Sequence, residues 1–207
     1  MLVSPTSIER TLPGRLEHKF RLSDRIAGDV RRYIAPHFRP DPHGASYRVQ
    51  GTYFDTPELG LYWQHRLHLP ERFKLRTRNY NEQSAPRFFE VKSKAAGRSF
   101  KNRIQESQFL ARANQIGARA TVDLQYDREA YVGQVNGEPV RLTIDKGIRF
   151  RRVGAGVWEY VDRPDSTILE VKHASPHNPF GFEMADELGL QPVAFSKYCG
   201  AIQRMNG

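Results

Sequence analysis

The sequence predicts an α+β fold in which about eight antiparallel β-strands form a closed β-barrel, with helices packed outside it. Several segments alternate charged and uncharged residues with the period of two that places successive side chains on opposite faces of a strand. Other segments carry helical apolar stripes, such as Ile26, Val30 and Ile34, which need a sheet surface to cover. If helices cover the outside, the charged strand faces turn inward, and a barrel of this size has room for one small ligand.

The clearest alternation lies in residues 72–78 and 87–94, which we expect to form a pair of strands joined by a turn-rich link. The first strand has one face made of cations: Lys74, Arg76 and Arg78. The second strand carries Glu90, Lys92 and Lys94 on one face. Its other face is apolar, with Phe89 and Val91, so each strand has one charged face and one face suited to packing.

The remaining elements follow in chain order, with helix ends marked by Ser23 as an N-cap, by Pro57 at a first turn and by Gly117 after a last turn. The predicted helices are 24–38, 57–67, 106–116, 180–188 and 196–205. The other predicted strands are 15–22, 46–54, 122–132, 140–145, 148–153, 158–161 and 167–173. Strand 122–132 places Tyr126 and Arg128 on one face, and strand 140–145 does the same for Arg141 and Asp145.

Composition restricts the class of protein. A chain of 207 residues with 39% hydrophobic content is long enough for one sizeable core, so we expect a single domain. Its formal net charge of +9 indicates an anionic partner, which by charge alone is nucleic acid, a phosphorylated metabolite or an acidic membrane. No segment resembles a signal peptide or a membrane span. Together with the single cysteine, Cys199, this predicts a cytoplasmic protein without a membrane span.

A Glu-x-Lys pattern occurs in three predicted strands, and its spacing puts both charges on one face. The three pairs are Glu17 with Lys19, Glu90 with Lys92 and Glu170 with Lys172. Each pair taken alone is equally typical of the solvent face of an antiparallel sheet. Taken together with the apolar helix stripes, the pairs favour an inward orientation. An interior rich in Lys and Arg is tolerated only when water and a polyanion compensate its charge.

The chain also resembles a known family in the order and spacing of eight segments: RLEHKFRL, TYFDTPELGLYWQH, RFKLRTRNY, RFFEVKSKAAGRSFKNR, QYDREAY, VRLTID, ILEVKH and FSKYCGAIQ. These are similar to the vacuolar transporter chaperone (VTC) domain, the polyphosphate polymerase branch of the triphosphate tunnel metalloenzymes. The resemblance runs from about Arg15 to Gln203. It implies a single tunnel domain over residues 15–207, preceded by an N-terminal extension at 1–14, and places this chain with the stand-alone bacterial forms.

The resemblance assigns roles residue by residue. It implies that phosphate binding and catalysis rest on Lys19, Arg76, Arg78, Lys92, Arg128 and Lys197. Further substrate contacts are implied for Lys101, Tyr126, Arg141 and Ser196. The strand faces add Lys74 and Lys172 to the substrate contacts. Glu170 matches the metal-holding carboxylate of the family, and Glu17 and Glu90 of the other Glu-x-Lys pairs are additional metal candidates.

The implied activity is transfer of the ATP γ-phosphate to a growing polyphosphate chain, with Mn²⁺ or Mg²⁺ as cofactor. Such a hard cation needs only one or two carboxylates when phosphate oxygens and water complete its shell. Transfer of this kind depends mainly on in-line positioning and on neutralising negative charge. The expected partners are ATP, triphosphate and polyphosphate, with no nucleic acid.

Two departures from the family pattern keep alternatives open. Hydrolases of the superfamily begin with Glu-x-Glu-x-Lys, whereas this chain has Arg15 at the first position, which argues against a tunnel triphosphatase. Ala194 stands in a segment where polymerases of the family can carry an additional lysine. This second departure leaves a non-catalytic module that binds polyphosphate or a nucleoside triphosphate as an alternative function.

Two further features of the sequence could bind a metal or a nucleic acid. His65 and His68 could share a helix face and bind a metal, but exposed surface histidines are the simpler interpretation without a third ligand. The basic segment 94–103 could form a nucleic-acid patch. We favour a mobile segment at the tunnel mouth that lays Lys101 onto a phosphate.

Overall fold

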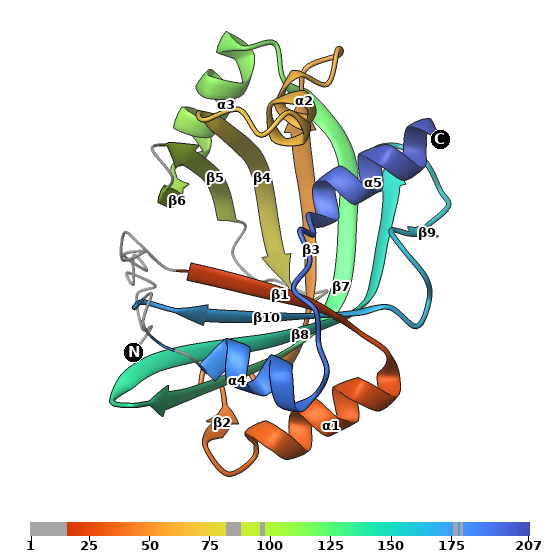
Figure 1. The fold of residues 1–207 in the computed structure, drawn as a ribbon. Helices are drawn as coiled ribbons and strands as arrows, with labels where there is room; N and C mark the ends of the chain where they lie inside the picture. The colour runs from red at the N-terminus through yellow and green to blue at the C-terminus, as the bar shows by residue number, and fades with distance from the viewer. Residues whose placement is uncertain (1–15, 82–87, 96–97, 176–177, 179) are drawn as a thin grey trace, which may run out of the picture.

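The computed structural model describes residues 16–81, 88–95, 98–175, 178 and 180–207. It shows an α+β fold built on one curled antiparallel sheet (Figure 1). The strands are β1 (Leu16–Leu22), β2 (Phe38–Pro40), β3 (Ser46–Asp55), β4 (Arg72–Tyr80), β5 (Phe88–Ala95), β6 (Arg98–Ile104), β7 (Arg119–Val135), β8 (Glu138–Arg152), β9 (Glu159–Tyr160) and β10 (Thr167–His173). The helices are α1 (Asp24–Ile34), α2 (Gly60–Arg66), α3 (Glu106–Gln115), α4 (Phe180–Glu187) and α5 (Lys197–Asn206).

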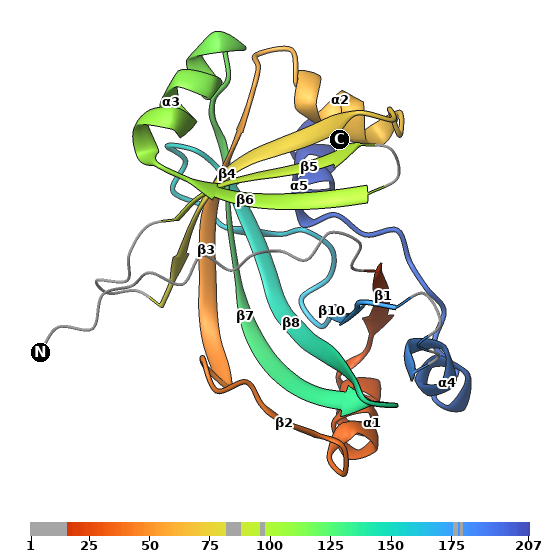
Figure 2. The same ribbon diagram turned by 90° about the vertical axis from the view of Figure 1, so that its left-hand side faces the viewer.

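The sheet is an open half-barrel, which corrects the prediction of a closed barrel. Its main strand order is β1-β10-β8-β7-β3-β4-β5-β6, and no pairing among the described residues joins β6 to β1. Figure 2 shows the long strands β7 and β8 curving through the middle of this order toward β1 and β10. One physical reason is that segment 192–193 already lies along the edge of β1, where the amide of Val193 donates a hydrogen bond to the carbonyl of Lys19 at 2.8 Å and Pro192 bridges to Phe20.

The strand register confirms the predicted inward faces. Residues directly opposite each other on paired strands share a face. The registered pairs include Lys74 with Lys92, Arg76 with Glu90, Lys92 with Lys101, Arg128 with Asp145, Glu170 with Lys19 and Lys172 with Glu17. These pairs come from seven strands and lie on one side of the sheet, and we call this concave surface the inner face.

The opposite, outer face is covered by helices in two places. At one end, Leu75 of β4 packs with Phe89 of β5 and Phe109 of α3, and Leu75 and Phe109 are fully buried. At the other end, α1 and α4 cover β1, β10 and β8, where Val30 and Met184 pack against Leu142. The apolar stripes of α1 and the apolar strand faces therefore pair as the sequence predicts.

Replacing Leu75 with alanine is expected to lower the free energy of unfolding by about 2–5 kcal/mol, because a fully buried side chain would leave a cavity behind. Urea unfolding of the variant measures this loss. Leu110→Ala on α3 is the matched control, since Leu110 is 44% exposed and its removal opens no cavity. Equal stability of the two variants would contradict the assignment of Leu75 to the core.

Helix α5 departs from the prediction that every helix packs outside. Its residues Tyr198 and Ile202 pack with Tyr53, Val122 and Tyr126, which belong to the inner-face register of β3 and β7. Tyr198 stacks on Tyr53 with ring centroids 4.9 Å apart. The helix therefore lies on the concave side and places its N-terminal residues beside the inner-face cations.

Several element boundaries also differ from the prediction. The two strands predicted at 140–145 and 148–153 form one long strand, β8, which Asn136 and Gly137, both at positive φ, connect to β7 in a tight hairpin. The segment 94–103, predicted as a mobile loop, contributes most of β6, although residues 96–97 lie outside the described residues. Helix α1 ends at Ile34, so that β2 pairs with β7, and α2 begins at Gly60 rather than at Pro57.

Residues 1–15, which include the predicted N-terminal extension and Arg15, lie outside the described residues. Among the helices of the described residues, none is both long enough and apolar enough to cross a membrane.

Candidate functional site

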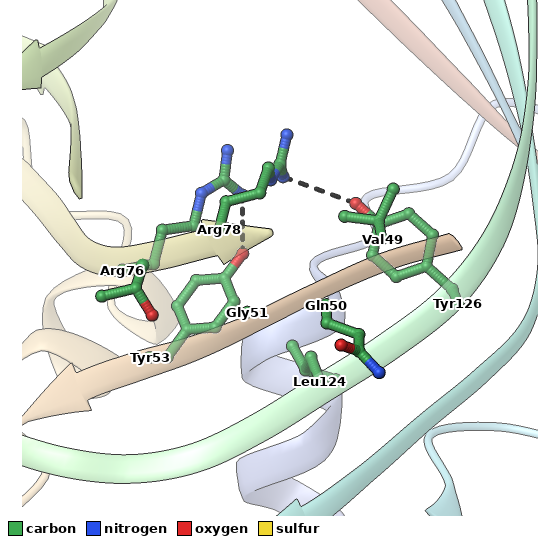
Figure 3. A pocket seen from close by; sticks show the side chains of 9 residues that line it. Val49, Gln50, Gly51, Tyr53, Arg76, Arg78, Leu124 and Tyr126 are labelled. Carbon is green, nitrogen blue, oxygen red and sulfur yellow. Dashed lines mark hydrogen bonds between the residues drawn. The ribbon is translucent and has the colours of Figure 1, made fainter. Parts of the chain in front are cut away.

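Two arginines and two tyrosines form the centre of the inner face (Figure 3). Arg76 and Arg78 come from β4, and the alternation of that strand directs both into the concave side. The Nη1 atom of Arg76 donates a hydrogen bond to the Tyr53 hydroxyl at 2.8 Å, and Nη2 of Arg78 donates to the Tyr126 hydroxyl at 3.4 Å. These contacts hold two guanidinium groups side by side in defined positions.

Glu90 of β5 is the counter-ion of this arginine pair. Its side chain is fully buried, and its two oxygens lie 2.7 Å from Arg76, 3.1 Å from Lys101, 3.4 Å from Arg103 and 3.9 Å from Arg78. Burial alone would raise the pKa of Glu90, but Arg76, Arg78 and Lys101 outweigh it and hold that pKa far below its usual range. The carboxylate is therefore ionised and organises four cations from two neighbouring strands.

A second anchored group lies where β7 and β8 approach the start of α5. Arg128 donates two hydrogen bonds to the buried carboxylate of Asp145, at 2.6 and 2.8 Å, and Lys197 of α5 lies 2.6 Å from the same carboxylate. Burial opposes ionisation, yet Arg128 and Lys197 lower the pKa of Asp145 to about 2. One carboxylate thus fixes two predicted phosphate-binding cations, Arg128 and Lys197.

The third group joins β1 and β10 to the rest of the inner face. Lys19 lies 2.8 Å from Glu17 and 3.7 Å from Glu170, while Lys172 lies 2.8 Å from Glu170 and Lys92 lies 3.7 Å from Glu17. Burial acts against the charge of Lys19, but Glu170 and Glu17 raise its pKa above the usual value. The Lys92–Glu17 pair also bridges β5 and β1, although their backbones are not paired.

Lys74 is the inner-face cation with the fewest compensating groups. Its ammonium donates to the Ser196 hydroxyl at 2.9 Å, and Ser196 also caps α5 by accepting from the amide of Cys199 at 3.2 Å. Among the described residues, no carboxylate pairs with Lys74. Burial, with Lys92 and Lys19 nearby, lowers the pKa of Lys74 to about 8.

The inner-face carboxylates differ in how well they suit a divalent cation. The described residues contain no group of three or more histidine, cysteine, aspartate or glutamate side chains able to hold a metal ion. Glu17 and Glu170 nevertheless lie on neighbouring strands with Lys19 in contact with both, and two carboxylates suffice for Mg²⁺ or Mn²⁺ when phosphate oxygens complete the shell. Cations surround both Glu90 and Glu170, but Glu170 has the carboxylate of Glu17 beside it, whereas the contacts of Glu90 are with arginine and lysine side chains, so Glu90 fits a metal less well.

The two-histidine alternative lacks support from its surroundings. His65 has a buried Nε2 atom without a hydrogen-bond partner among the described residues. Burial, with Lys74 and Arg72 nearby, lowers the pKa of His65 to about 3. His68 lies beyond the end of α2 at a positive φ of 53°. Neighbouring cations oppose the binding of a metal cation at this position.

The structure places all of the predicted site residues on the inner face or at the start of α5. Those on the inner face are Glu17, Lys19, Lys74, Arg76, Arg78, Glu90, Lys92, Lys101, Tyr126, Arg128, Arg141, Glu170 and Lys172, with Ser196 and Lys197 at the start of α5. Arg141 is directed away from the central group, since its guanidinium lies 2.9 Å from Asp41.

Sequence reasoning missed Tyr53, Arg103 and the anchoring role of Asp145. Tyr53 shares the β3 face that pairs with Arg76, and its pKa is lowered to about 8: burial raises it, but Arg76, Arg78 and Lys74 outweigh that effect. The alternation of side chains in strand 46–54 would have identified Tyr53 as an inner-face residue if the pairing of this strand with β4 had been known. Arg103 required the recognition of β6 as a strand.

An open antiparallel half-barrel with a cation-lined concave face, anchored by buried carboxylates, defines the class of protein to which this chain belongs. The sequence matches the family model of the VTC domain over residues 14–114 and 109–206. The chain therefore belongs to the VTC domain family, as its sequence segments indicate.

Solved structures support the fold. The chain is similar to the PH1819 protein of Pyrococcus horikoshii OT3, with a TM-score of 0.56, 16% identity and coverage of 92% of this chain and 97% of that one. A provisionally named adenylate cyclase of Bacillus halodurans gives a TM-score of 0.55 at 13% identity over 89% and 95% of the two chains. A similarly named Vibrio parahaemolyticus protein gives 0.50 at 12% identity over 88% and 94%. At these identities the likeness concerns the fold alone. No curated protein shows significant sequence similarity to the chain.

Proposed function

We propose that the inner face binds triphosphate and polyphosphate, and that the protein transfers the γ-phosphate of ATP to a polyphosphate chain. The observation that carries this proposal is the convergence of cations from six strands and α5 on one concave surface. These cations outnumber the carboxylates that pair with them, so an elongated polyanion compensates the remaining charge. Membership of the VTC domain family supports the same assignment.

The spacing of Arg76 and Arg78 suits the binding of successive phosphates of one chain. Arg76 and Arg78 are two residues apart on one strand face, which corresponds to a separation of about 7 Å along the chain direction. Guanidinium groups bind phosphate oxygens through paired hydrogen bonds, whereas Lys101 acts as a more mobile point charge. Since Glu90 already holds these groups in place, little reorganisation is needed when the phosphates arrive.

The second cation group continues the same surface. Arg128 and Lys197 are fixed by Asp145, and both lie over the ring of Tyr126, whose hydroxyl accepts a hydrogen bond from Arg78. Lys74 and Lys92 are paired on the neighbouring strands β4 and β5. Burial lowers the pKa of Lys92, and Lys19 contributes to that effect even though Glu17 acts in the opposite direction. Phosphate oxygens would supply the anionic contacts that these lysines need to stay charged.

Glu17 and Glu170 are the residues that would hold Mn²⁺ or Mg²⁺. When bound there, such an ion would supply positive charge that offsets the negative charge of the transferred phosphate. Lys19 is in contact with both carboxylates and reduces the repulsion between them. Its ammonium adds one positive charge to those of the divalent ion beside the bound phosphates. With ATP as phosphate donor, the proposed reaction belongs in the cytoplasm.

Product analysis tests the proposal. Purified protein is incubated with ATP and Mn²⁺, and long-chain polyphosphate is separated from free phosphate. We expect long chains that grow with time and require the divalent ion. Tight binding of tripolyphosphate without any product would identify a non-catalytic binding module, and free phosphate alone would identify a triphosphatase. Either result would overturn the polymerase assignment.

The pKa of Lys74 predicts how binding changes with pH. A polyanion favours the charged lysine, so binding is strongest below the folded-state pKa of about 8 and weakens as pH rises through that value. We expect the affinity for tripolyphosphate to fall about tenfold between about pH 7 and about pH 9 from this one group. Isothermal titration calorimetry across this range measures the change.

Lys74→Arg is the matched control, because arginine keeps its charge over the same range. The variant should retain the pH dependence due to Tyr53 and to the ligand itself, and should lose the part due to Lys74. The quantity compared is the slope of the logarithm of tripolyphosphate affinity against pH, which does not depend on any change in absolute affinity between wild type and variant. Identical slopes for the two proteins would remove Lys74 from the binding site.

A further inference from the structure

A second cavity lies on the outer face, behind the arginine pair. Its volume is about 170 Å³, many times the roughly 10–15 Å³ that a single buried water requires. Gln50 and Thr52 of β3, Asn79 of β4, Asp123 of β7, Arg151 of β8 and Trp158 contribute side chains to its walls. In Figure 3, Gln50 points to the side of β3 opposite Arg76 and Arg78. The outer cavity and the inner face therefore lie on opposite sides of one sheet.

The walls of the outer cavity are polar but carry no net charge. Asp123 accepts hydrogen bonds from the Thr52 hydroxyl at 2.7 Å and from Nε of Arg151 at 3.1 Å. The same guanidinium lies 4.7 Å from the ring centroid of Trp158, which fixes the indole next to this ion pair. A carboxylate already paired with the arginine disfavours a phosphate, so the cavity suits a neutral ligand.

Asn79 indicates which chemical group a ligand of this cavity should carry, namely a hydrogen-bond donor. Its Oδ1 atom is buried and has no hydrogen-bond partner among the described residues, a condition that costs free energy until a donor arrives. A side-chain amide offers an acceptor and a donor side by side. This arrangement matches the amino group and adjacent ring nitrogen of adenine, and an indole provides a stacking surface for the same flat ring.

We propose that the outer cavity is a binding site for an adenine-type nucleobase, distinct from the phosphate-binding inner face. Asn79 contacts the amino edge of the base, Trp158 packs against its ring, and the Asp123–Arg151 pair closes the side of the cavity. A nucleoside without any phosphate is a sufficient ligand, so this proposal is independent of the function proposed for the inner face.

The sheet between the two surfaces is closed to a ligand. A Cβ atom on Gly51 of β3 would lie 2.4 Å from the carbonyl oxygen of Thr77 on β4, so the two backbones are in close approach at this point. Gly51 and Thr77 line both the outer cavity and the small pocket beside Arg76 and Arg78. A base bound outside therefore cannot pass its phosphates to the inner face, and the two sites fill independently.

Tryptophan fluorescence tests the proposal directly. The chain contains two tryptophans, and Trp63 is 50% exposed on α2, so Trp63→Phe leaves Trp158 as the only tryptophan reporter in the full chain. We expect saturable quenching of Trp158 by adenosine, unchanged when saturating tripolyphosphate is present. Inosine, which has a carbonyl in place of the amino group, should bind about tenfold more weakly. Absence of saturable quenching, competition by tripolyphosphate or equal binding of inosine would each overturn the proposal.

A pair of variants in the same background locates the site. Asn79→Leu should weaken adenosine binding about tenfold, and Asn79→Ser, which retains a small polar group, provides a second variant if the first folds poorly. Arg48→Gln alters a partly exposed residue of β3 that pairs with Asp127 and does not line the cavity, and it should leave binding unchanged. Wild-type adenosine affinity in both folded Asn79 variants would overturn the assignment.

Discussion

Replacing Glu170 with glutamine is expected to lower metal-dependent turnover about 100-fold, the upper range seen when a metal-binding environment is altered. Glutamine keeps the shape of the side chain and removes its charge. Glu170 is buried beside Lys172 and Lys19, and burial acts against its ionisation, yet these lysines hold its pKa well below the usual range. The wild-type residue is therefore charged at neutral pH and is available to a divalent cation.

The same substitution should leave metal-free binding of tripolyphosphate intact or make it tighter, because the inner face loses one negative charge. Turnover is measured as a function of Mn²⁺ concentration, and binding is measured by calorimetry in the presence of a chelator. Glu183→Gln is the control, since this exposed acid lies on α4, which covers the outer face of the sheet. Wild-type turnover in Glu170→Gln would exclude Glu170 from the mechanism.

The inner face could be predicted from sequence because strand periodicity depends only on the chain itself. The alternation of 72–78 directs Lys74, Arg76 and Arg78 to one side, and the observed register agrees. The apolar stripe of α1 likewise predicts a helix against a sheet, which the packing of Val30 against Leu142 bears out. These features are local, and the hydrophobic effect then decides which side faces the helices.

The position of α5 could not be predicted in the same way. Its placement rests on contacts between distant segments, such as Lys74 with Ser196 and Lys197 with Asp145. An amphipathic helix carries no information about which side of a curled sheet it will cover. The stacking of Tyr198 on Tyr53 places α5 on the concave side of the sheet. The backbone contact of Val193 with Lys19, also between distant segments, occupies the edge of β1 that a closed barrel would need.

The buried carboxylates explain how so many cations share one surface. Asp145 and Glu90 each neutralise and align several basic side chains, at distances of direct hydrogen bonding. Glu90 was predicted as a metal candidate because a Glu-x-Lys pattern looks the same in every strand. Its four cationic neighbours include Lys101 and Arg103 of β6, which the sequence does not reveal as strand partners.

Glu90→Gln is expected to lower the free energy of unfolding by about 3–5 kcal/mol, the cost of removing one partner from a buried ion pair. The side chain is fully buried, and Arg76, Arg78 and Lys101 would be left without their counter-ion. Chemical denaturation at neutral pH measures the loss. Glu159→Gln, which changes an exposed acid on β9, should leave stability unchanged.

The pH dependence of this loss follows from the lowered pKa of Glu90. A carboxylate with a depressed folded-state pKa stabilises the protein above its unfolded pKa of 4.5, and this contribution disappears as pH falls toward the folded value. The stability gap between wild type and Glu90→Gln should therefore be constant from neutral pH to about pH 5 and shrink below it.

Tripolyphosphate should then stabilise Glu90→Gln more than it stabilises the wild type, because the ligand supplies the negative charge that the variant lacks. Thermal unfolding with increasing tripolyphosphate, in the absence of divalent metal, measures this rescue. A variant as stable as the wild type, with no added response to the ligand and with lost dependence on Mn²⁺, would instead identify Glu90 as a metal ligand. Its contacts with Arg76 and Lys101 favour the first result, since a carboxylate surrounded by cations holds them in place for phosphate.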